Sequence, residues 1–203
     1  GEVFQECFQR QTFENLDGTT GALLTNVLQD RFYWNAFLKT RVELTDRLTV
    51  EAGLNRNKTR YAQEDLNIAD SLEPGTPEFE EADQSGSYDF EPIWSPRVGL
   101  NYQLSSNYST YASASRGFAR PSVQETLSPS GGLNPDIQPE RGWSYEIGAR
   151  GFWPDAKLSY RASAFYMRVE DKLVARRVGP DSYIGLNAGA TTHQGLELSV
   201  KGQ

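Results

Sequence analysis

Residue-by-residue alternation of apolar and polar side chains most constrains the fold of this chain. Between residues 35 and 44 one parity is apolar or small and the other is mostly polar. Successive residues of a β-strand point to opposite faces, so this segment is predicted to be a strand with one apolar and one polar face. The apolar parity holds Ala36, Leu38, Thr40, Val42 and Leu44, and the polar parity holds Asn35, Lys39, Arg41 and Glu43.

Very short polar turns join the alternating segments in pairs, which predicts three hairpins. A further alternating segment near the C-terminal end brings the expected number of strands to about seven. The hairpins are predicted at about 32–61, 95–118 and 142–170, with turns at Thr45-Asp46, Ser105-Ser106-Asn107 and Pro154-Asp155, and the last strand at about 188–201.

Residues 1 to about 31 give no clear prediction. Asp17-Gly18 followed by Gly21 is turn chemistry. The apolar residues of 23–28 fit a helical turn or an ordered loop equally well, and the region is left unassigned.

Connection lengths alternate between very short and long, which distinguishes two all-β architectures. The long polar connections are predicted at about 62–94, 119–141 and 171–187, all on the side opposite the short turns. Outer-membrane barrels show this asymmetry, and their strands need roughly 9–11 residues to cross a bilayer. A β-sandwich places long and short connections at both ends. An antiparallel transmembrane β-barrel is therefore favoured.

Aromatic side chains fit a belt at a membrane interface, although they fit a soluble core almost as well. These residues are Tyr102, Trp143, Tyr145, Tyr160 and Tyr166.

Composition agrees with a barrel, and a transmembrane helix is excluded because no run of apolar residues approaches the roughly 18 that one requires. The hydrophobic fraction is 37% and the mean hydropathy is −0.60. These low values still fit a barrel, because a barrel strand is only half apolar.

The net charge of −7 is concentrated in one segment. Residues 62–94 hold ten acidic and no basic side chains, which leaves 20 basic against 17 acidic side chains elsewhere. That acidic segment lacks the spaced ligands of an EF-hand, so a solvated loop is expected rather than a calcium site. No basic patch indicates a nucleic-acid partner.

Catalytic and cofactor signatures are not found, so we expect neither an enzyme nor a bound cofactor. Cys7 and His193 are the only residues of their types, which excludes an internal disulfide and leaves one histidine for any triad. No phosphate-binding glycine loop, zinc spacing or nucleophile elbow occurs.

An ordered series of short motifs resembles the barrel of TonB-dependent outer-membrane receptors, over about residues 32–203. Within it, the stretch Leu173–Glu197 is especially similar to ferric-citrate-type receptors. The motifs are Ser95–Tyr102, Tyr111–Phe118, Arg120-Pro121-Ser122, Asn134-Pro135, Gln138-Pro139-Glu140, Tyr145–Gly148, Asn187-Ala188-Gly189 and Gln194–Glu197.

The resemblance implies that residues 1–203 are a partial β-barrel domain, an interior part of a barrel of about 22 strands. Family members also carry an N-terminal plug domain, which holds the motif gripped by the energising protein, and terminal strands. Neither is recognised in this sequence, so both are expected to lie outside it.

The resemblance also implies a function: uptake of a ferric siderophore or similar iron chelate across the outer membrane of a Gram-negative bacterium. The implied partners are the chelate, a TonB-type energising protein acting through the plug, and outer-membrane lipid. Guanidinium groups suit the carboxylate oxygens of such chelates, although solvated rim charges are the plainer interpretation. The candidate ligand-binding residues are Arg116, Arg120, Arg176 and Arg177.

Two alternatives stay open. One is a TonB-dependent importer of glycans or another nutrient, and the other is a soluble β-sandwich or adhesin module. The barrel predicts that Leu38, Val50, Leu100 and Leu198 point outward, whereas a soluble module would pack them together in a core.

Overall fold

The computed structural model describes residues 1–66, 83–122, 125–127, 132–134, 136–179 and 183–202. This part of the chain contains eleven strands, and it contains no helix long and apolar enough to cross a membrane. The strands are β1 (Glu2–Leu16), β2 (Thr19–Glu43), β3 (Leu48–Asp65), β4 (Gly86–Asp89), β5 (Ile93–Ser105), β6 (Tyr108–Ala119), β7 (Glu140–Trp153), β8 (Leu158–Glu170), β9 (Leu173–Arg177), β10 (Tyr183–Asn187) and β11 (Ala190–Gly202).

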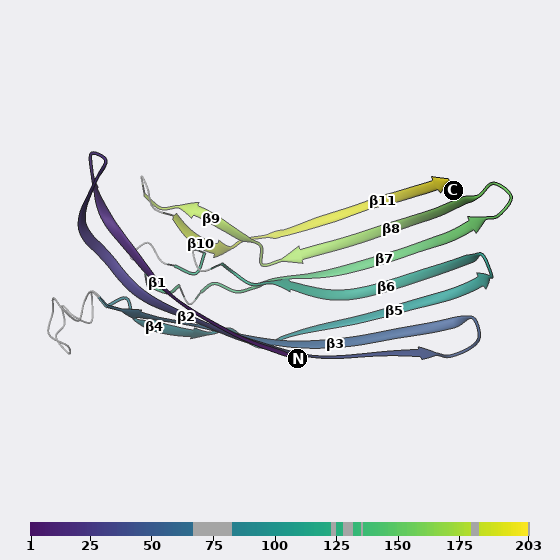
Figure 1. Cartoon of the computed structure of the whole chain (residues 1–203), viewed down its shortest axis with the longest axis horizontal. Helices are drawn as coiled ribbons and strands as arrows, with labels where there is room; N and C mark the ends of the chain where they lie inside the picture. The colour runs from purple at the N-terminus through teal and green to yellow at the C-terminus, as the bar shows by residue number, and fades with distance from the viewer. Residues whose placement is uncertain (67–82, 123–124, 128–131, 135, 180–182, 203) are drawn as a thin grey trace.

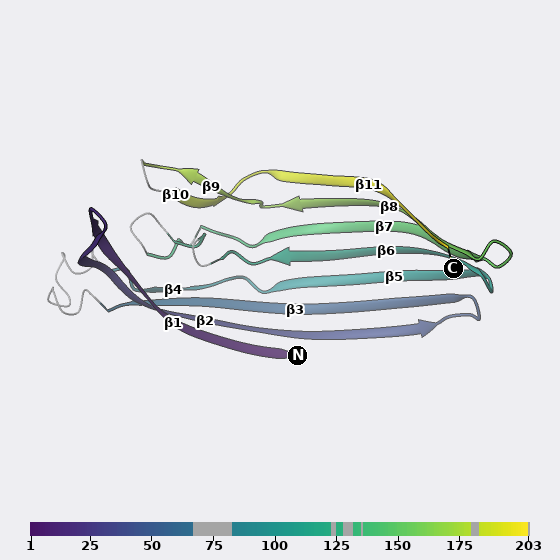
Figure 2. The same ribbon diagram turned by 45° about the horizontal axis from the view of Figure 1, so that its top comes forward.

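One long sheet dominates the structure and curves into an open trough (Figures 1 and 2). Its strands follow the order β1-β2-β3-β5-β6-β7-β8-β11, and every neighbouring pair is antiparallel. β4 pairs with residues 60–63 of β3, and β9 pairs with β10 in a separate hairpin. The long sheet is a single layer and not half of a sandwich, which removes the β-sandwich alternative.

All three predicted hairpins and the last strand are confirmed. Short turns at 44–47, 106–107 and 154–157 lie at one end of the trough, called here the short-turn end (Figure 1). The long connections leave from the other end, called the loop end. In the first turn the backbone N–H of Leu48 donates to Thr45 Oγ1 at 3.0 Å, which explains why threonine opens it.

The predicted count of seven strands was too low by four. β4 lies within the connection predicted at about 62–94, and β9 and β10 lie within the one predicted at about 171–187. The fourth, β1, comes from residues 1–31, which were left unassigned. They form β1 and the first half of β2, joined by a turn at Asp17-Gly18 with φ of 49° and 89°. Two successive positive φ values are typical of the two-residue hairpin turn that this dipeptide favours. At the loop end the hairpin tip turns away from the other strands (Figure 1), and its strands lack the clean alternation seen further along the chain.

The strand register separates two faces of the sheet. Leu38 lies opposite Leu54, Val50 opposite Leu100, and Ala162 opposite Leu198, all on the outer face. Leu38, Leu100 and Leu198 are 74%, 45% and 75% exposed. The apolar parity is therefore turned outward and is not packed in a core, as the barrel prediction required.

Aromatic residues of the outer face gather at two levels. The five residues predicted for a belt all lie on this face. Trp143 and Trp153 mark the two levels on β7, ten residues apart, which is roughly 33 Å along a strand and about 25 Å across a membrane at the usual strand tilt of about 40°. Tyr102, Tyr108, Trp153 and Tyr160 lie nearer the short turns, and Trp34, Trp94, Trp143, Tyr145 and Tyr166 lie nearer the loop end.

The buried apolar side chains at the loop end come from several connections and form a small core. Tyr61 of β3 packs edge-on against Phe90 with ring centroids 5.2 Å apart, and Ile137 is fully buried beside them. Asn187 ties the last connection to this core, since its Nδ2 donates to the carbonyl oxygen of Gln138 at 2.8 Å. Gln138 Nε2 donates to the Tyr88 hydroxyl at 2.7 Å. The described residues of these connections therefore pack against one another and form a wall at the loop end.

Replacing Gly185 by alanine is expected to loosen this wall. A β-carbon at 185 would collide with the carbonyl oxygen of Glu125 and approach Ile137 Cδ1 to 3.1 Å, an overpacking that costs about 1–3 kcal/mol. Amide hydrogen exchange should accelerate in β10 and at 136–139 and remain unchanged in β5–β8. Gly86→Ala is the matched control, since nothing lies within 4 Å of its added carbon. Equal exchange in both variants would contradict this packing.

Candidate functional site

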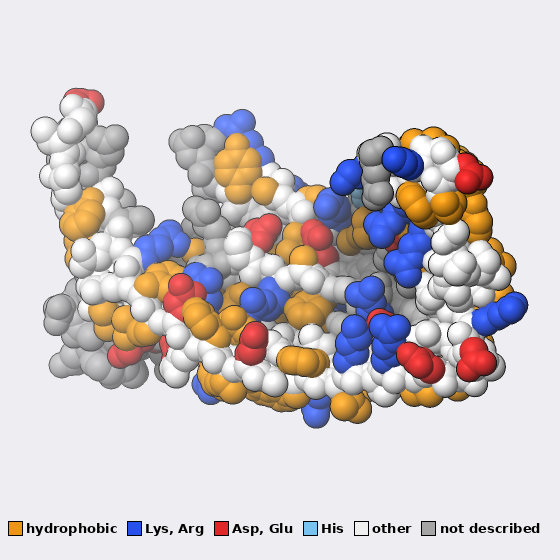
Figure 3. All heavy atoms as spheres, turned by 45° about the vertical axis from the view of Figure 1, so that its right-hand side comes forward, with side chains coloured by type: hydrophobic (Ala, Val, Ile, Leu, Met, Phe, Trp, Pro, Cys, Tyr) orange, Lys and Arg blue, Asp and Glu red, His pale blue; other side chains and the backbone are white. Residues whose placement is uncertain are grey.

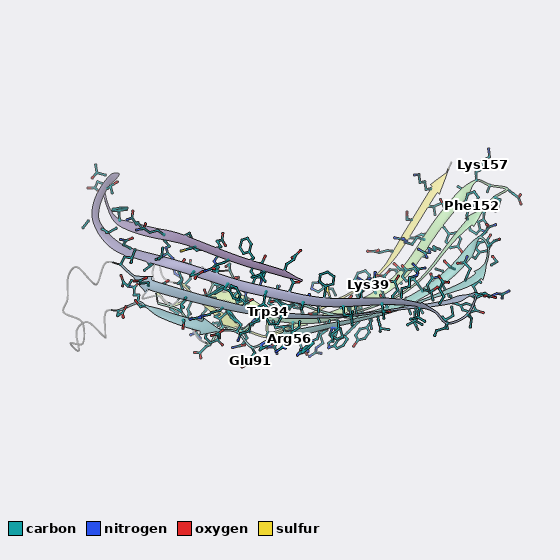
Figure 4. The ribbon with its side chains drawn as sticks, turned by 60° about the horizontal axis from the view of Figure 1, so that its bottom comes forward. Trp34, Lys39, Arg56, Glu91, Phe152 and Lys157 are labelled. Atoms are coloured by element: carbon teal, nitrogen blue, oxygen red, sulfur yellow. The ribbon has the colours of Figure 1, made fainter. Side chains whose placement is uncertain are left out.

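The inner, concave face of the trough is polar and carries both signs of charge. Lys39 and Arg41 of β2 each pair with Glu51 of β3, at 3.4 and 3.7 Å. Lys39 lies on the opposite side of the sheet from Trp34 and Arg56 (Figure 4). Lysine and arginine side chains surround the hollow seen in Figure 3. This distribution suits a water-filled interior, with the apolar surface turned away from it.

One inner-face contact fills a gap in the sheet. The ring of Tyr111 on β6 occupies the space where a side chain at Gly148 on β7 would stand. The Tyr111 hydroxyl then donates to Glu146 Oε1 at 2.5 Å. The glycine therefore allows a large aromatic ring to lie flat against the wall.

A cavity of about 370 Å³ lies on the inner face near the loop end. Strand register builds it: Glu6, Arg31 and Tyr61 form one row across β1, β2 and β3. The segment after β6 closes the remaining side. The lining residues are Phe4, Glu6, Arg31, Tyr33, Tyr61, Arg120 and Pro121.

Arg31 lies at the centre of this wall. Its Cζ is 4.6 Å from the ring centroid of Phe8 and 5.9 Å from that of Tyr61, and its Nη1 is 3.6 Å from Glu6 Oε2. Its Nε is buried and has no hydrogen-bond partner among the described residues. Arg31 therefore retains a donor that its surroundings leave unused.

Arg120 enters from the opposite side, after the end of β6. Its Cζ lies 4.1 Å from the ring centroid of Tyr33, which also contacts Phe4 at 5.0 Å between centroids. The next residue accepts a hydrogen bond at its carbonyl oxygen from the Tyr61 hydroxyl, at 2.9 Å. This bond fixes the chain at Pro121 and so holds Arg120 over the aromatic ring.

Tyr61 is a hydrogen-bond donor throughout the physiological pH range. Burial raises the pKa of its hydroxyl above the ordinary value, and the charges of Arg120 and Arg31 offset part of that rise. The phenol thus stays protonated, as its bond to Pro121 requires.

Two guanidinium groups held against aromatic rings define what this cavity can bind. Guanidinium forks recognise carboxylate and related oxygen anions by paired, charge-assisted hydrogen bonds. With Glu6 as the one lining carboxylate among the described residues, the cavity keeps a net positive charge. Its chemistry therefore favours an anionic ligand that carries flat oxygen-rich groups.

The four arginines predicted from sequence are not brought together. Arg120 lines the cavity, whereas Arg116 pairs with Trp143 on the outer face. Arg176 and Arg177 are exposed on β9, outside the cavity lining, and Arg177 Nε donates to the carbonyl oxygen of Gly179 at 2.9 Å. Arg31 was missed because it lies at the end of the unassigned segment. Only the pairing of β2 with β1 and β3 reveals which face it occupies.

The acidic segment gives no metal site within the described residues. Residues 67–82 lie outside the described part, and the described part contains no group of three or more potential metal ligands. Asp89, at the near edge of the segment, pairs with Lys58 at 3.3 Å and Arg60 at 4.0 Å.

Comparison with known proteins places this geometry in a family context. The family model for "TonB dependent receptor-like, beta-barrel" matches residues 2–203. The ferric-pyoverdine M114 receptor PbuA of Pseudomonas sp. strain M114 is 25% identical over 171 residues, which are 84% of this chain and 19% of that protein. The metal-pseudopaline receptor CntO of Pseudomonas aeruginosa is 29% identical over 111 residues, which are 53% of this chain and 14% of that protein. The chain thus spans a fifth or less of the length of these relatives.

A solved structure supports the fold independently. The ferric citrate transporter FecA in the unliganded form superposes with a TM-score of 0.65 at 15% sequence identity. The superposition covers 98% of this chain and 27% of that one. At this level of identity the likeness establishes the architecture alone.

Proposed function

The chain belongs to the family of TonB-dependent receptor β-barrels, and from this membership we propose that it serves uptake of a ferric siderophore or similar iron chelate across the outer membrane of a Gram-negative bacterium. The names of the relatives support the ligand class, since PbuA is a ferric-pyoverdine receptor and CntO a metal-pseudopaline receptor. The proposal extends their chemistry to this chain.

The cavity of Arg31 and Arg120 is the observation that carries the proposal. Ferric chelates of citrate, catecholate or hydroxamate type present oxygen atoms around the metal and are often anionic. Arg31 and Arg120 would meet these oxygens from two sides, and the exposed ring of Phe4 would contact a flat part of the chelate.

The remaining predicted arginines take different places in this proposal. Arg176 and Arg177, exposed on β9, attract an anionic chelate toward the loop end without touching it in the cavity. Arg116 is not expected to contact the ligand, because its pairing with Trp143 puts it on the outer face. Arg120 alone keeps the role predicted from sequence.

Transport completes the proposed cycle without breaking a bond in the ligand. The trough would form one part of the wall of a barrel of about 22 strands, with a plug domain inside it. A TonB-type energising protein acts on that plug and releases the chelate toward the short-turn end. The polar inner face gives a hydrated path for this movement.

Import of a neutral glycan is less well supported by the same cavity. Sugar sites use open aromatic faces as stacking platforms. Here the guanidinium of Arg120 already covers the ring of Tyr33, and that of Arg31 covers Phe8. Covered rings and a net positive charge favour the anionic chelate.

Uptake of radioactive iron by iron-starved cells tests the proposal. Cells lacking the gene for the full receptor should lose uptake of at least one ferric chelate from a panel of citrate, pyoverdine, catecholate and hydroxamate types. A plasmid copy should restore it, and a protonophore should abolish the restored uptake. Normal uptake of every chelate, with loss of growth on a glycan instead, would overturn the proposal.

A further inference from the structure

The outer face is apolar between the two aromatic levels, a surface called here the apolar belt. Toward the loop end it carries many cationic side chains instead. At this level three pairs of neighbouring strands each place a cation opposite an indole ring. Arg56 of β3 lies opposite Trp94 of β5, and Arg116 of β6 lies opposite Trp143 of β7. Trp143 in turn lies opposite Arg168 of β8. We call Arg56, Arg116 and Arg168, with Trp94 and Trp143, the basic band.

Arg56 shows how the band is built. Its Cζ lies 5.1 Å from the ring centroid of Trp94 and 5.7 Å from that of Trp34, and its side chain is exposed. Trp34 and Arg56 occupy the same side of the sheet, away from Lys39 (Figure 4). The two indoles hold the guanidinium at the outer surface by cation–π contacts.

Carboxylates neutralise only part of this surface. Arg168 forms an ion pair with Glu170 at 3.0 Å, and Asp89 forms ion pairs with Lys58 and Arg60. Neither Arg56 nor Arg116 makes an ion pair with any residue that the structure describes. Further cations of this level add to the excess: Lys58, Arg60 and Arg141 share the outer face, against Asp89, Glu91 and Glu170.

The surface directly below the band is apolar. Leu54 follows Arg56 on the same face of β3 toward the short-turn end, and Leu38 lies opposite Leu54. On β7, Ile147 lies on the short-turn side of Trp143 and is 61% exposed. A ligand that covers both levels needs an anionic head and hydrocarbon chains. A free phosphate would use only the upper level, so the continuity of the two favours a lipid.

We propose that the basic band binds the phosphate groups of a lipid in the outer leaflet of the membrane, while the apolar belt below receives its acyl chains. The inference rests on the proposed function, because that function puts the loop end on the external side. Phosphate oxygens accept paired hydrogen bonds from arginine forks. Tryptophan at the level of the headgroups suits the boundary between apolar and polar layers.

Retention of lipid A by the full receptor in detergent tests this proposal. The test variant is R56Q/R116Q/R168Q, and the control K157Q/R161Q/K201Q removes the same charge near the short-turn end. With bisphosphorylated lipid A as probe, native mass spectrometry should find at least about tenfold less lipid on the test variant than on wild type, since each basic residue at a membrane surface adds to the attraction of an anionic lipid. The control should retain lipid like wild type.

Two further probes separate lipid from free phosphate. Lipid A without phosphate groups should bind wild type as weakly as the test variant binds the phosphorylated form. Inorganic phosphate should fail to displace bound lipid A at matched concentration. Equal retention by wild type and test variant, or displacement by inorganic phosphate alone, would overturn the proposal. Binding of ferric chelate by the same preparations is a separate readout, so failure of the lipid site is distinguishable from failure of the uptake function.

Discussion

Replacing Arg31 and Arg120 together by glutamine in the full receptor is expected to weaken binding of the ferric chelate by at least about a hundredfold. Each charge-assisted hydrogen bond is worth about 1.5–3 kcal/mol, and the double variant removes one guanidinium from each side of the cavity. The measurement is a titration of the purified receptor with whichever chelate supports uptake, followed by quenching of intrinsic fluorescence.

Two matched variants make this result specific. Arg120→Lys keeps the charge but loses the planar fork, so its affinity should fall between those of wild type and the double variant. R176Q/R177Q removes two exposed charges outside the cavity and should change affinity by less than about threefold through weaker attraction. The 3.6 Å contact of Arg31 with Glu6 is partly exposed and contributes little to folding. Unchanged affinity in the double variant, with normal folding, would remove the cavity as the ligand site.

Replacing Ile147 by arginine is expected to destabilise the full receptor in lipid vesicles by about 2–4 kcal/mol, the range for a cation on the lipid face near the bilayer midplane. Ile147 is 61% exposed and lies between Ala112 and Ala164, midway between the two aromatic levels. Folding into vesicles and unfolding by denaturant measure the loss.

The matched control is Ser144→Arg on the same strand. Ser144 lies opposite Ser115 and Met167 on the inner face, where an added charge meets a polar surface. Its effect should stay within about 0.5 kcal/mol, the usual scale for surface substitutions. Equal losses from the two variants would mean that the two faces of β7 do not differ in environment, and the barrel interpretation would fail with them.

The sequence alone predicted the strands that face apolar surroundings on one side. In β2, β5 and β7 one face must be apolar, which imposes a strict alternation of apolar and polar side chains. Pro154-Asp155 indicates a turn because proline and aspartate favour turn conformations. The β1–β2 hairpin was not predicted, because its tip turns away from the other strands at the loop end (Figure 1), where neither face has to be uniformly apolar. Only the dipeptide Asp17-Gly18 indicated a turn in this segment, and it does not predict the length of the two strands that it joins.

The candidate site was only partly predictable for a related reason. Arg120 was found through its position after a strand, but Arg31 acquires its role from pairing between β1, β2 and β3. Side-chain direction depends on register, and register in this irregular segment is fixed by partners more than twenty residues away in sequence. The same dependence explains Arg116, which was predicted for the ligand and lies on the opposite face of the wall.

The pairing of Tyr111 with Gly148 carries an evolutionary consequence. A bulkier residue at 148 is tolerated only when position 111 becomes small, so descendants of this gene should show correlated changes at the two sites, with intermediates that carry both large residues purged by selection. Covariation between them across orthologues would then record a steric constraint within the wall and would carry no information about what the receptor imports.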